Sequence, residues 1–131
     1  MTQPVTATTH GVRVTVTSKY HPEQSRPSQN KYVHSYDVTI SNFSGLEIQL
    51  ISRHWIINDA HGKVREVKGD GVIGQQPVLL PEESHSYTSW CPLSTPVGKM
   101  GGSYIMIRKA DNSIFEVTIP EFKLIADFKY N

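Results

Sequence analysis

The residues that most resemble a chemical motif form a glycine-rich stretch at residues 69–74. Gly69, Gly71 and Gly74 have the G-x-G-x-x-G spacing of loops that bind dinucleotides, and Lys68 directly precedes them. In such loops the backbone N–H groups and a neighbouring cation hold a pyrophosphate group. These four residues are therefore the first candidates for a phosphate site.

A dinucleotide site also needs a strand before the glycines and a helix after them, because the helix N-terminus holds the phosphate. Residues 63–68 alternate in the manner of a strand, so the first condition is met. Pro77 and Pro81 follow the glycines closely, and a helix interior does not tolerate this spacing of prolines. The sequence favours a turn between strands, where glycine supplies a positive φ.

A third interpretation of the loop needs no helix. Consecutive glycine N–H groups can form a small anion-binding nest, and Lys63, Arg65 and Lys68 would add positive charge beside it. Asp70 within the loop would repel the ligand. Weak binding of pyrophosphate or a nucleotide at residues 69–74 therefore remains an alternative function.

Catalytic and metal-binding patterns are sparse. The histidines form no H-x-H or H-x₃-H pair, and Cys91 lies between Trp90 and Pro92 with no base beside it in the sequence. No serine occupies a G-x-S-x-G motif. We expect no catalytic residue, no metal site and no cofactor. The six histidines are His10, His21, His34, His54, His61 and His85.

Length and composition narrow the protein class. A chain of 131 residues is the size of one domain, which we expect over residues 11–131 after a flexible polar lead-in at residues 1–10. The formal net charge of +1 gives no electrostatic basis for nucleic-acid binding. No apolar run is long enough for membrane insertion, and a single cysteine suits a reducing compartment. These features favour a cytoplasmic protein.

The rest of the sequence is dominated by strand patterns. Apolar and polar residues alternate with the period of two that indicates half-buried strands, and no amphipathic helix is evident. The phase changes near Ser52 and Arg53, which predicts a bulge or bend there. This pattern predicts an all-β, antiparallel two-sheet sandwich of seven or eight strands. The alternating segments are residues 12–20, 31–42, 46–58, 63–68, 84–90, 103–109 and 113–119.

The C-terminal segment is the candidate partner surface. Pro120 interrupts the last clear strand, and residues 122–128 are expected to resume as an edge strand with apolar side chains. Edge strands expose unpaired backbone groups that a protein partner or a second copy can pair with, so a homodimer is also consistent with the sequence. An exposed subset of the aromatic residues would add to the surface. The candidate partner residues are Trp90, Phe122, Leu124 and Phe128.

Several motifs, in order and over about residues 12–125, resemble the ApaG (CorD) family. The matching segments are RHWII at residues 53–57, VKGDGVIGQQP at 67–77, YTS at 87–89 and TPVGKMGGSY at 95–104. Two residues depart from the usual family pattern: Trp90 stands where the family usually has glycine, and Glu82 replaces the glycine of a Pro-Gly-Glu turn.

The resemblance implies an immunoglobulin-like, fibronectin type III-like sandwich in a bacterial cytoplasmic protein whose biochemical activity is not established. It also implies a link to cobalt resistance and magnesium efflux, and to a neighbouring dinucleoside-tetraphosphate hydrolase. Related domains in eukaryotic F-box proteins look like partner-binding modules. Together with the residues above, the resemblance predicts a non-enzymatic binding module that acts through a protein partner.

Overall fold

The computed structural model describes residues 3–126, and within that range the secondary structure is almost entirely β. Two short 3₁₀ turns, at Pro22–Gln24 and Pro27–Gln29, interrupt the loop between β2 and β3. The strands are β1 (Val5–Thr9), β2 (Val12–Tyr20), β3 (Tyr32–Asn42), β4 (Ile48–Asp59), β5 (Val64–Asp70), β6 (Val78–Leu79), β7 (Ser84–Leu93), β8 (Val97–Arg108) and β9 (Ile114–Ile125).

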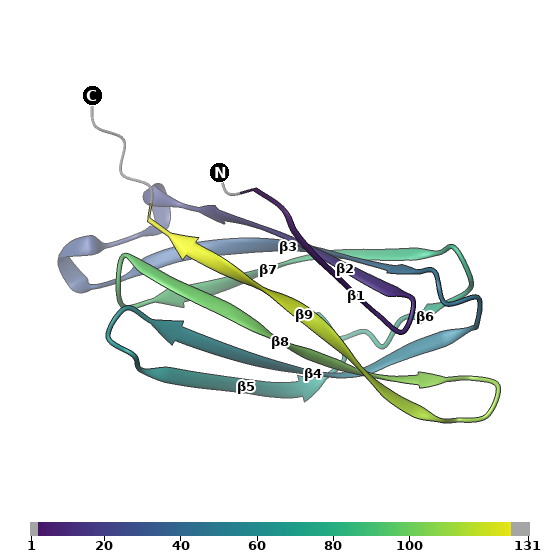
Figure 1. Ribbon diagram of the computed structural model, residues 1–131. Coiled ribbons are helices and arrows are strands. Elements are labelled where there is room, and N and C mark those ends of the chain that lie inside the picture. The colour runs from purple at the N-terminus through teal and green to yellow at the C-terminus, as the bar shows by residue number, and fades with distance from the viewer. Residues whose placement is uncertain (1–2, 127–131) are drawn as a thin grey trace.

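These strands form two antiparallel sheets that stack as two layers (Figure 1). One sheet has the order β1-β2-β3-β7, and the other has the order β5-β4-β8-β9 with the short β6 paired to β4. The chain crosses between the layers after β3 and again around β7, so sequence neighbours lie in different sheets. The predicted all-β, two-sheet sandwich is confirmed, with nine strands in the described range rather than seven or eight.

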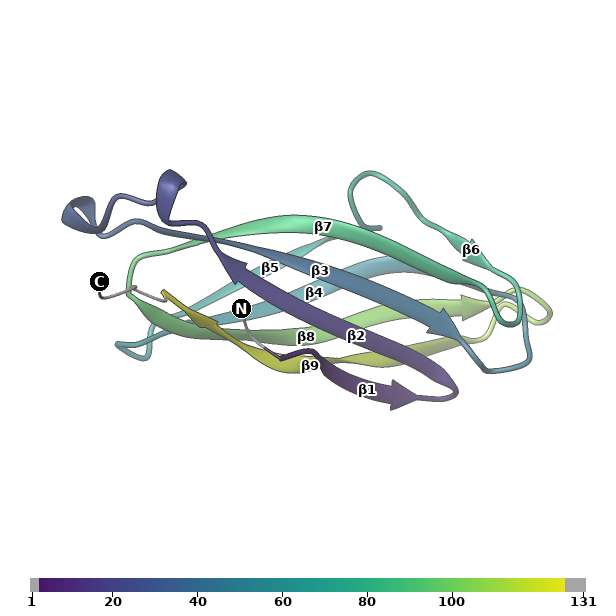
Figure 2. The ribbon, with the colours of Figure 1, turned by 90° about the horizontal axis from the view of Figure 1, so that it is seen from above.

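The two sides of the sandwich differ. On one side β9 lies against β1 and β2, and the Thr118 N–H donates to Thr9 Oγ1 at 3.2 Å, so the two sheets are joined there (Figure 2). The opposite side has β7 as the last strand of one sheet and β5 as the last strand of the other. We call the space between β5 and β7 the open seam.

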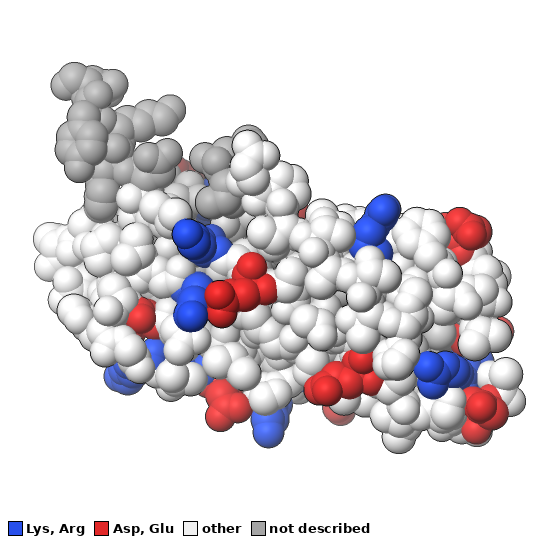
Figure 3. All heavy atoms as spheres, in the orientation of Figure 1, with Lys and Arg blue, Asp and Glu red and all other residues white. Residues whose placement is uncertain are grey.

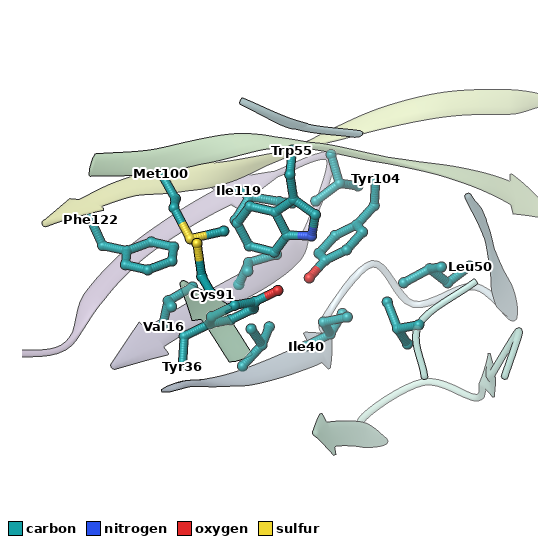
Figure 4. Close-up of a cluster of buried hydrophobic side chains, with 14 of the residues drawn as sticks. Val16, Tyr36, Ile40, Leu50, Trp55, Cys91, Met100, Tyr104, Ile119 and Phe122 are labelled. Carbon is teal, nitrogen blue, oxygen red and sulfur yellow. The ribbon is translucent and has the colours of Figure 1, made fainter. Parts of the chain in front are cut away.

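The core between the layers follows from the period-two pattern. Alternate side chains of β2 and β3 point inward and pack on those of β4, β8 and β9 (Figure 4). An aromatic cluster lies at its centre, where the Tyr36 ring is 5.1 Å from Trp55 and 5.8 Å from Phe122, and Trp55 meets Tyr104 edge to face at 6.5 Å. Such pairs add to the stability from burial by about 0.5–1.5 kcal/mol each.

Residues 5–9 correct the expectation of a flexible lead-in at residues 1–10. They form β1, which pairs in full register with β2, from Val5 opposite Val16 to Thr9 opposite Val12. A threonine-rich segment is polar enough to look unstructured, but β-branched residues suit an edge strand with one solvated face. The ordered domain therefore includes residues that the sequence assigned to the lead-in.

The C-terminal segment corrects the proposed partner surface. Pro120 does not end the strand, because β9 has a bulge there: the register shifts between Met100 and Gly102, and two β9 residues face one of β8. Phe122 is 4 % exposed and Leu124 is fully buried, so both are core residues and are not accessible to a partner. Phe128 lies outside the described residues.

Two further features of the second sheet bear on the site. The bulge predicted near residues 52–53 is confirmed, since the register of β4 against β8 shifts between Leu50 and Ser52. This shift places both Leu50 and Trp55 in the core, although their positions differ in parity. It also gives Arg53 the same inward direction as Trp55 and Ile57.

Asn42 joins the two layers where β3 ends. Its fully buried side chain donates to the carbonyls of Leu46 and Leu79 at 2.7 and 3.0 Å and accepts from the Ser44 N–H at 3.0 Å. We expect Asn42→Ala to lower the free energy of unfolding by about 2 kcal/mol, because it leaves buried carbonyl groups without donors. Urea denaturation measures the loss. Asn58→Ala is the matched control, since that side chain has no hydrogen bond to the described residues, and an equal loss in both variants would contradict this role.

Candidate functional site

The glycine stretch at the end of β5 forms a tight turn, as its composition favoured. Gly71 and Gly74 have φ values of 64° and 73°, which glycine adopts without strain. The Gly71 N–H donates to the Ile51 carbonyl, and Val72 and Gln75 exchange both backbone hydrogen bonds. The N–H groups of Gly71 and Val72, which an anion nest would use, are therefore engaged within the protein, and the chain continues into β6 rather than a helix.

The same turn presents carbonyl groups to a cation. Arg53 Nη1 donates to the carbonyls of Asp70 and Gly71 at 3.0 and 2.9 Å. Gly69 leaves room for this guanidinium, since a Cβ there would lie 2.9 Å from its nitrogens. Lys68 and Gly69 line a second hollow beside β5, to which Arg53 also contributes. The motif residues thus position an arginine. Lys68 and Gly69 share the hollow, whereas Gly71 and Gly74 are not among its lining residues.

That arginine lines a pocket of about 330 Å³ in the open seam. The pocket forms because Arg53, Trp55 and Ile57 of β4 project inward towards β7, while β5 extends the sheet beyond the edge of the core. Its polar atoms come from arginine, tyrosine and serine side chains, and the remainder of the wall is apolar. The lining residues are Tyr36, Arg53, Trp55, Ile57, Arg65, Val67, Ser89, Trp90, Cys91, Pro92 and Met100.

Positive charge in this pocket has no acidic counterpart. Arg65 crosses the open seam, where its Nη2 donates to the Pro92 carbonyl at 3.0 Å and to Cys91 Sγ at 3.4 Å. No aspartate or glutamate lines the pocket, and among residues 3–126 neither Arg53 nor Arg65 has a carboxylate within 4.0 Å. Each guanidinium uses one Nη for these contacts and keeps its other N–H donors available.

Tyrosine hydroxyls add neutral donors beside the arginines. Burial raises the pKa of Tyr36, whose hydroxyl hydrogen-bonds Ser89. Burial likewise raises the pKa of both Tyr87 and Tyr104, which are not among the pocket-lining residues and whose hydroxyls hydrogen-bond each other. The phenols stay protonated at neutral pH. The pocket therefore combines two cations with hydroxyl donors, an arrangement that suits an oxyanion.

The thiol in the pocket wall is not set up as a nucleophile. Burial raises the pKa of Cys91, which opposes the thiolate form that attacks substrates. His34 lies opposite Cys91 in the register of β3 and β7, but His34 Nε2 makes no hydrogen bond within the described residues. The thiol therefore lacks the paired imidazole that activates catalytic cysteines.

Other reactive groups lie apart. His54 Nε2 contacts Glu66 Oε1 at 2.7 Å on the outer face of the second sheet. Within residues 3–126, no three His, Cys, Asp or Glu side chains lie close enough together to hold a metal ion. In the same range, no helix has the length and apolar character to cross a bilayer. On the face in Figure 3, basic and acidic side chains are intermixed rather than gathered by sign.

Trp90 is the one proposed partner residue that the structure places at the pocket. It borders the pocket from β7, its side chain is 48 % exposed, and its ring lies 4.5 Å from that of His21.

Comparison with known proteins shows the family. A family model for the ApaG domain matches residues 22–108. The chain belongs to the ApaG domain family. It is 51 % identical over 118 residues to Protein ApaG of Methylobacterium radiotolerans, covering 90 % of each sequence, and 52 % identical to that of Bordetella pertussis, covering 88 % of this chain and 87 % of the relative.

The fold of this ApaG domain also matches a solved relative. The crystal structure of a putative ApaA protein from Bordetella pertussis superposes with a TM-score of 0.84 at 51 % identity, covering 87 % of this chain and 92 % of that one. The resemblance drawn from the sequence motifs is thereby confirmed at the level of family and fold.

The sequence interpretation did not include Arg53 among the site residues of this ApaG domain, and it placed Arg65 beside the glycine loop rather than in the pocket. For Arg53 a signal was present, because it shares the parity of Trp55 and Ile57 and must point inward with them once the bulge precedes it. For Arg65 the sequence indicated a cation on this strand but not its position in the pocket. Its place opposite Ile57 and its reach to β7 depend on the strand register and on how the two sheets stack.

Proposed function

We propose that this ApaG-domain protein is a non-enzymatic binding module and that a protein partner docks along the open seam. The observation that supports this best is the seam itself: two strands that end their sheets flank a pocket with an exposed tryptophan and two arginines, neither of which has an ion pair within residues 3–126. Concave sites with a few convergent polar groups are the usual binding sites of folded domains.

The free edge of β5 gives a partner a way to bind. Among residues 3–126 β5 pairs with β4 alone, so its other side presents N–H and C=O groups to which an extended segment can add. Val64 and Val67 of β5 are exposed, as is Trp90 across the pocket. On the opposite side of the sandwich the terminal strands β1 and β9 pack against each other, and the Thr118 N–H donates to Thr9 Oγ1 across them.

The charges of β5 favour a different protein over a second copy. Arg65, Glu66, Lys68 and Asp70 lie on this one strand. Charged side chains on an edge strand oppose indiscriminate pairing between identical chains. A partner with complementary charges would satisfy them, and a homodimer is the competing outcome of the test below.

The wider family association fits the same proposal. A link to cobalt resistance and magnesium efflux would act through the bound protein, with no metal held by this chain. A cytoplasmic setting belongs to the proposal as well, supported by a sequence with one cysteine.

Site-specific photo-crosslinking tests the proposal. Val67 in the open seam and Ile114 at the start of β9 are both exposed apolar residues, so each can be replaced by p-benzoyl-phenylalanine without opening the core. Irradiation in living cells is expected to give a discrete crosslinked band from position 67 and none from position 114, with mass spectrometry identifying the partner.

Three results would count against the proposal. A band at position 114 alone would place the binding surface on the β9 side. A band from position 67 with the mass of two copies of this chain would replace the partner with a homodimer. The absence of any band at both positions would remove the support for a stable protein partner.

A further inference from the structure

We infer that the pocket between Arg53 and Arg65 receives the carboxylate of an acidic side chain on the partner segment. The inference rests on the proposed function and specifies its chemistry. Of the residues that the structure describes, two arginines and no acidic residue line the pocket. A polar group that a segment inserts there meets the two arginines and hydroxyl groups.

The geometry around each guanidinium supports this. Arg53 is anchored by the carbonyls of Asp70 and Gly71, and Arg65 by the carbonyl of Pro92. Carbonyl groups fix a guanidinium in place without neutralising it, so both groups keep their full charge. A guanidinium that is already held in place loses little side-chain entropy when it binds a carboxylate through two parallel hydrogen bonds.

The apolar part of the pocket fits a side chain better than a free ion. Trp55, Ile57, Val67 and Met100 form part of the wall, next to the hydroxyls of Tyr36 and Ser89. The methylene groups of a glutamate can lie on the apolar wall while its carboxylate reaches the arginines. An extended segment added beside β5 would direct alternate side chains towards this pocket.

The same observations locate the oxyanion away from the glycine turn. The turn contributes its carbonyls to Arg53, and its N–H groups at Gly71 and Val72 are engaged internally. The glycine spacing suggested that an anion binds at the turn. The two arginines that could bind an anion lie in the neighbouring pocket. Carboxylate and phosphate both bind such cations, so the experiment has to separate them.

NMR titration of the whole chain provides the test. The probes are the blocked pentapeptide Ac-Thr-Val-Glu-Val-Thr-NH₂, the same peptide with glutamine in place of glutamate, and inorganic pyrophosphate. The signals to follow are the Arg53 and Arg65 Nε–H groups and the Trp90 indole N–H. The glutamate peptide is expected to shift all three and to bind roughly tenfold more tightly than the glutamine peptide, because a charge-assisted hydrogen bond exceeds a neutral one.

Variants connect the preference to the pocket. Arg65→Gln is expected to abolish the preference for glutamate, and Arg65→Lys to retain part of it, because lysine keeps the charge but not the planar fork. Arg13→Gln is the matched control: it removes the same charge, but Arg13 lies 4.9 Å over the Phe43 ring on the outer side of β2. This control should bind as the original protein does.

Three outcomes would overturn the inference. One is equal binding of the two peptides, and another is a preference for glutamate that survives Arg65→Gln. The third is tighter binding of pyrophosphate than of the glutamate peptide at the same three signals, which would make this a phosphate site. If crosslinking from position 67 persists in any of these cases, the proposed function stands and only the carboxylate inference fails.

Discussion

Replacing Gly102 by alanine is expected to lower the free energy of unfolding by at least about 3 kcal/mol. Gly102 lies in β8 opposite Trp55 of β4, with a φ of 156°. A Cβ at this position would lie 1.9 Å from the His54 carbonyl oxygen and 3.1 Å from the Trp55 Cα. Both neighbours are backbone atoms of a central strand, so relief requires separating β8 from β4.

Urea denaturation of the alanine variant provides the measurement, and two glycines serve as controls. At Gly101 the nearest atom to an added Cβ is 3.3 Å away, and at Gly74 there is none within 4 Å, although φ is 73°. Gly74→Ala should cost only about 1 kcal/mol for the backbone conformation. A loss at Gly102 no larger than that at Gly74 would show that the sheet adjusts to the added methyl group at little cost.

Acidification is expected to destabilise the protein through His34, by about 3 kcal/mol between pH 7 and pH 4. Burial first, and then the charge of His21, lower the pKa of His34 from 6.5 to about 4. The side chain is 1 % exposed, and its Nε2 has no hydrogen-bond partner among the described residues. The unfolded chain therefore binds the proton more readily than the folded one, and stability is full above pH 6.5 and falls as the pH drops towards 4.

Denaturation midpoints measured across this pH range test the expectation. In His34→Phe, the free energy of unfolding should fall less between pH 7 and pH 4, and the difference is the contribution of this one histidine. Phenylalanine fills a similar volume against the Tyr20 ring and cannot be protonated. His61→Gln, in an exposed turn, is the control and should keep the original profile. An unchanged slope in His34→Phe would assign the acid sensitivity to other groups.

The fold was predictable to the extent that solvent exposure alternates along each strand. The inward valines of β2 and the bulge of β4 were both evident in the sequence. When a strand with a period of two bulges, the apolar residues change from odd to even positions or the reverse. The strand β1 was missed because threonine is polar yet β-branched. The continuity of β9 through Pro120 was missed because the bulge that accommodates proline is formed with Gly101 of the neighbouring strand.

The candidate site was far less predictable, and the reason is physical. A glycine spacing is a local property, and it correctly indicated a turn. The pocket, in contrast, is formed by residues from two sheets. No local sequence pattern predicts how the edge strand β5 of one sheet lies relative to the edge strand β7 of the other. Arg53 could have been recognised as inward-pointing, whereas the position of Arg65 over Pro92 depends on how the two layers stack.

The open seam also determines which part of the domain opens most easily. β5 is held by one ladder of hydrogen bonds, to β4, and most of its side chains are exposed, whereas β4 is paired on both sides. Local unfolding requires least free energy where few neighbours must separate, so β5 is the most compliant long strand of the second sheet. A segment added along its free edge would supply the missing second ladder, and recognition would then also stiffen the receptor.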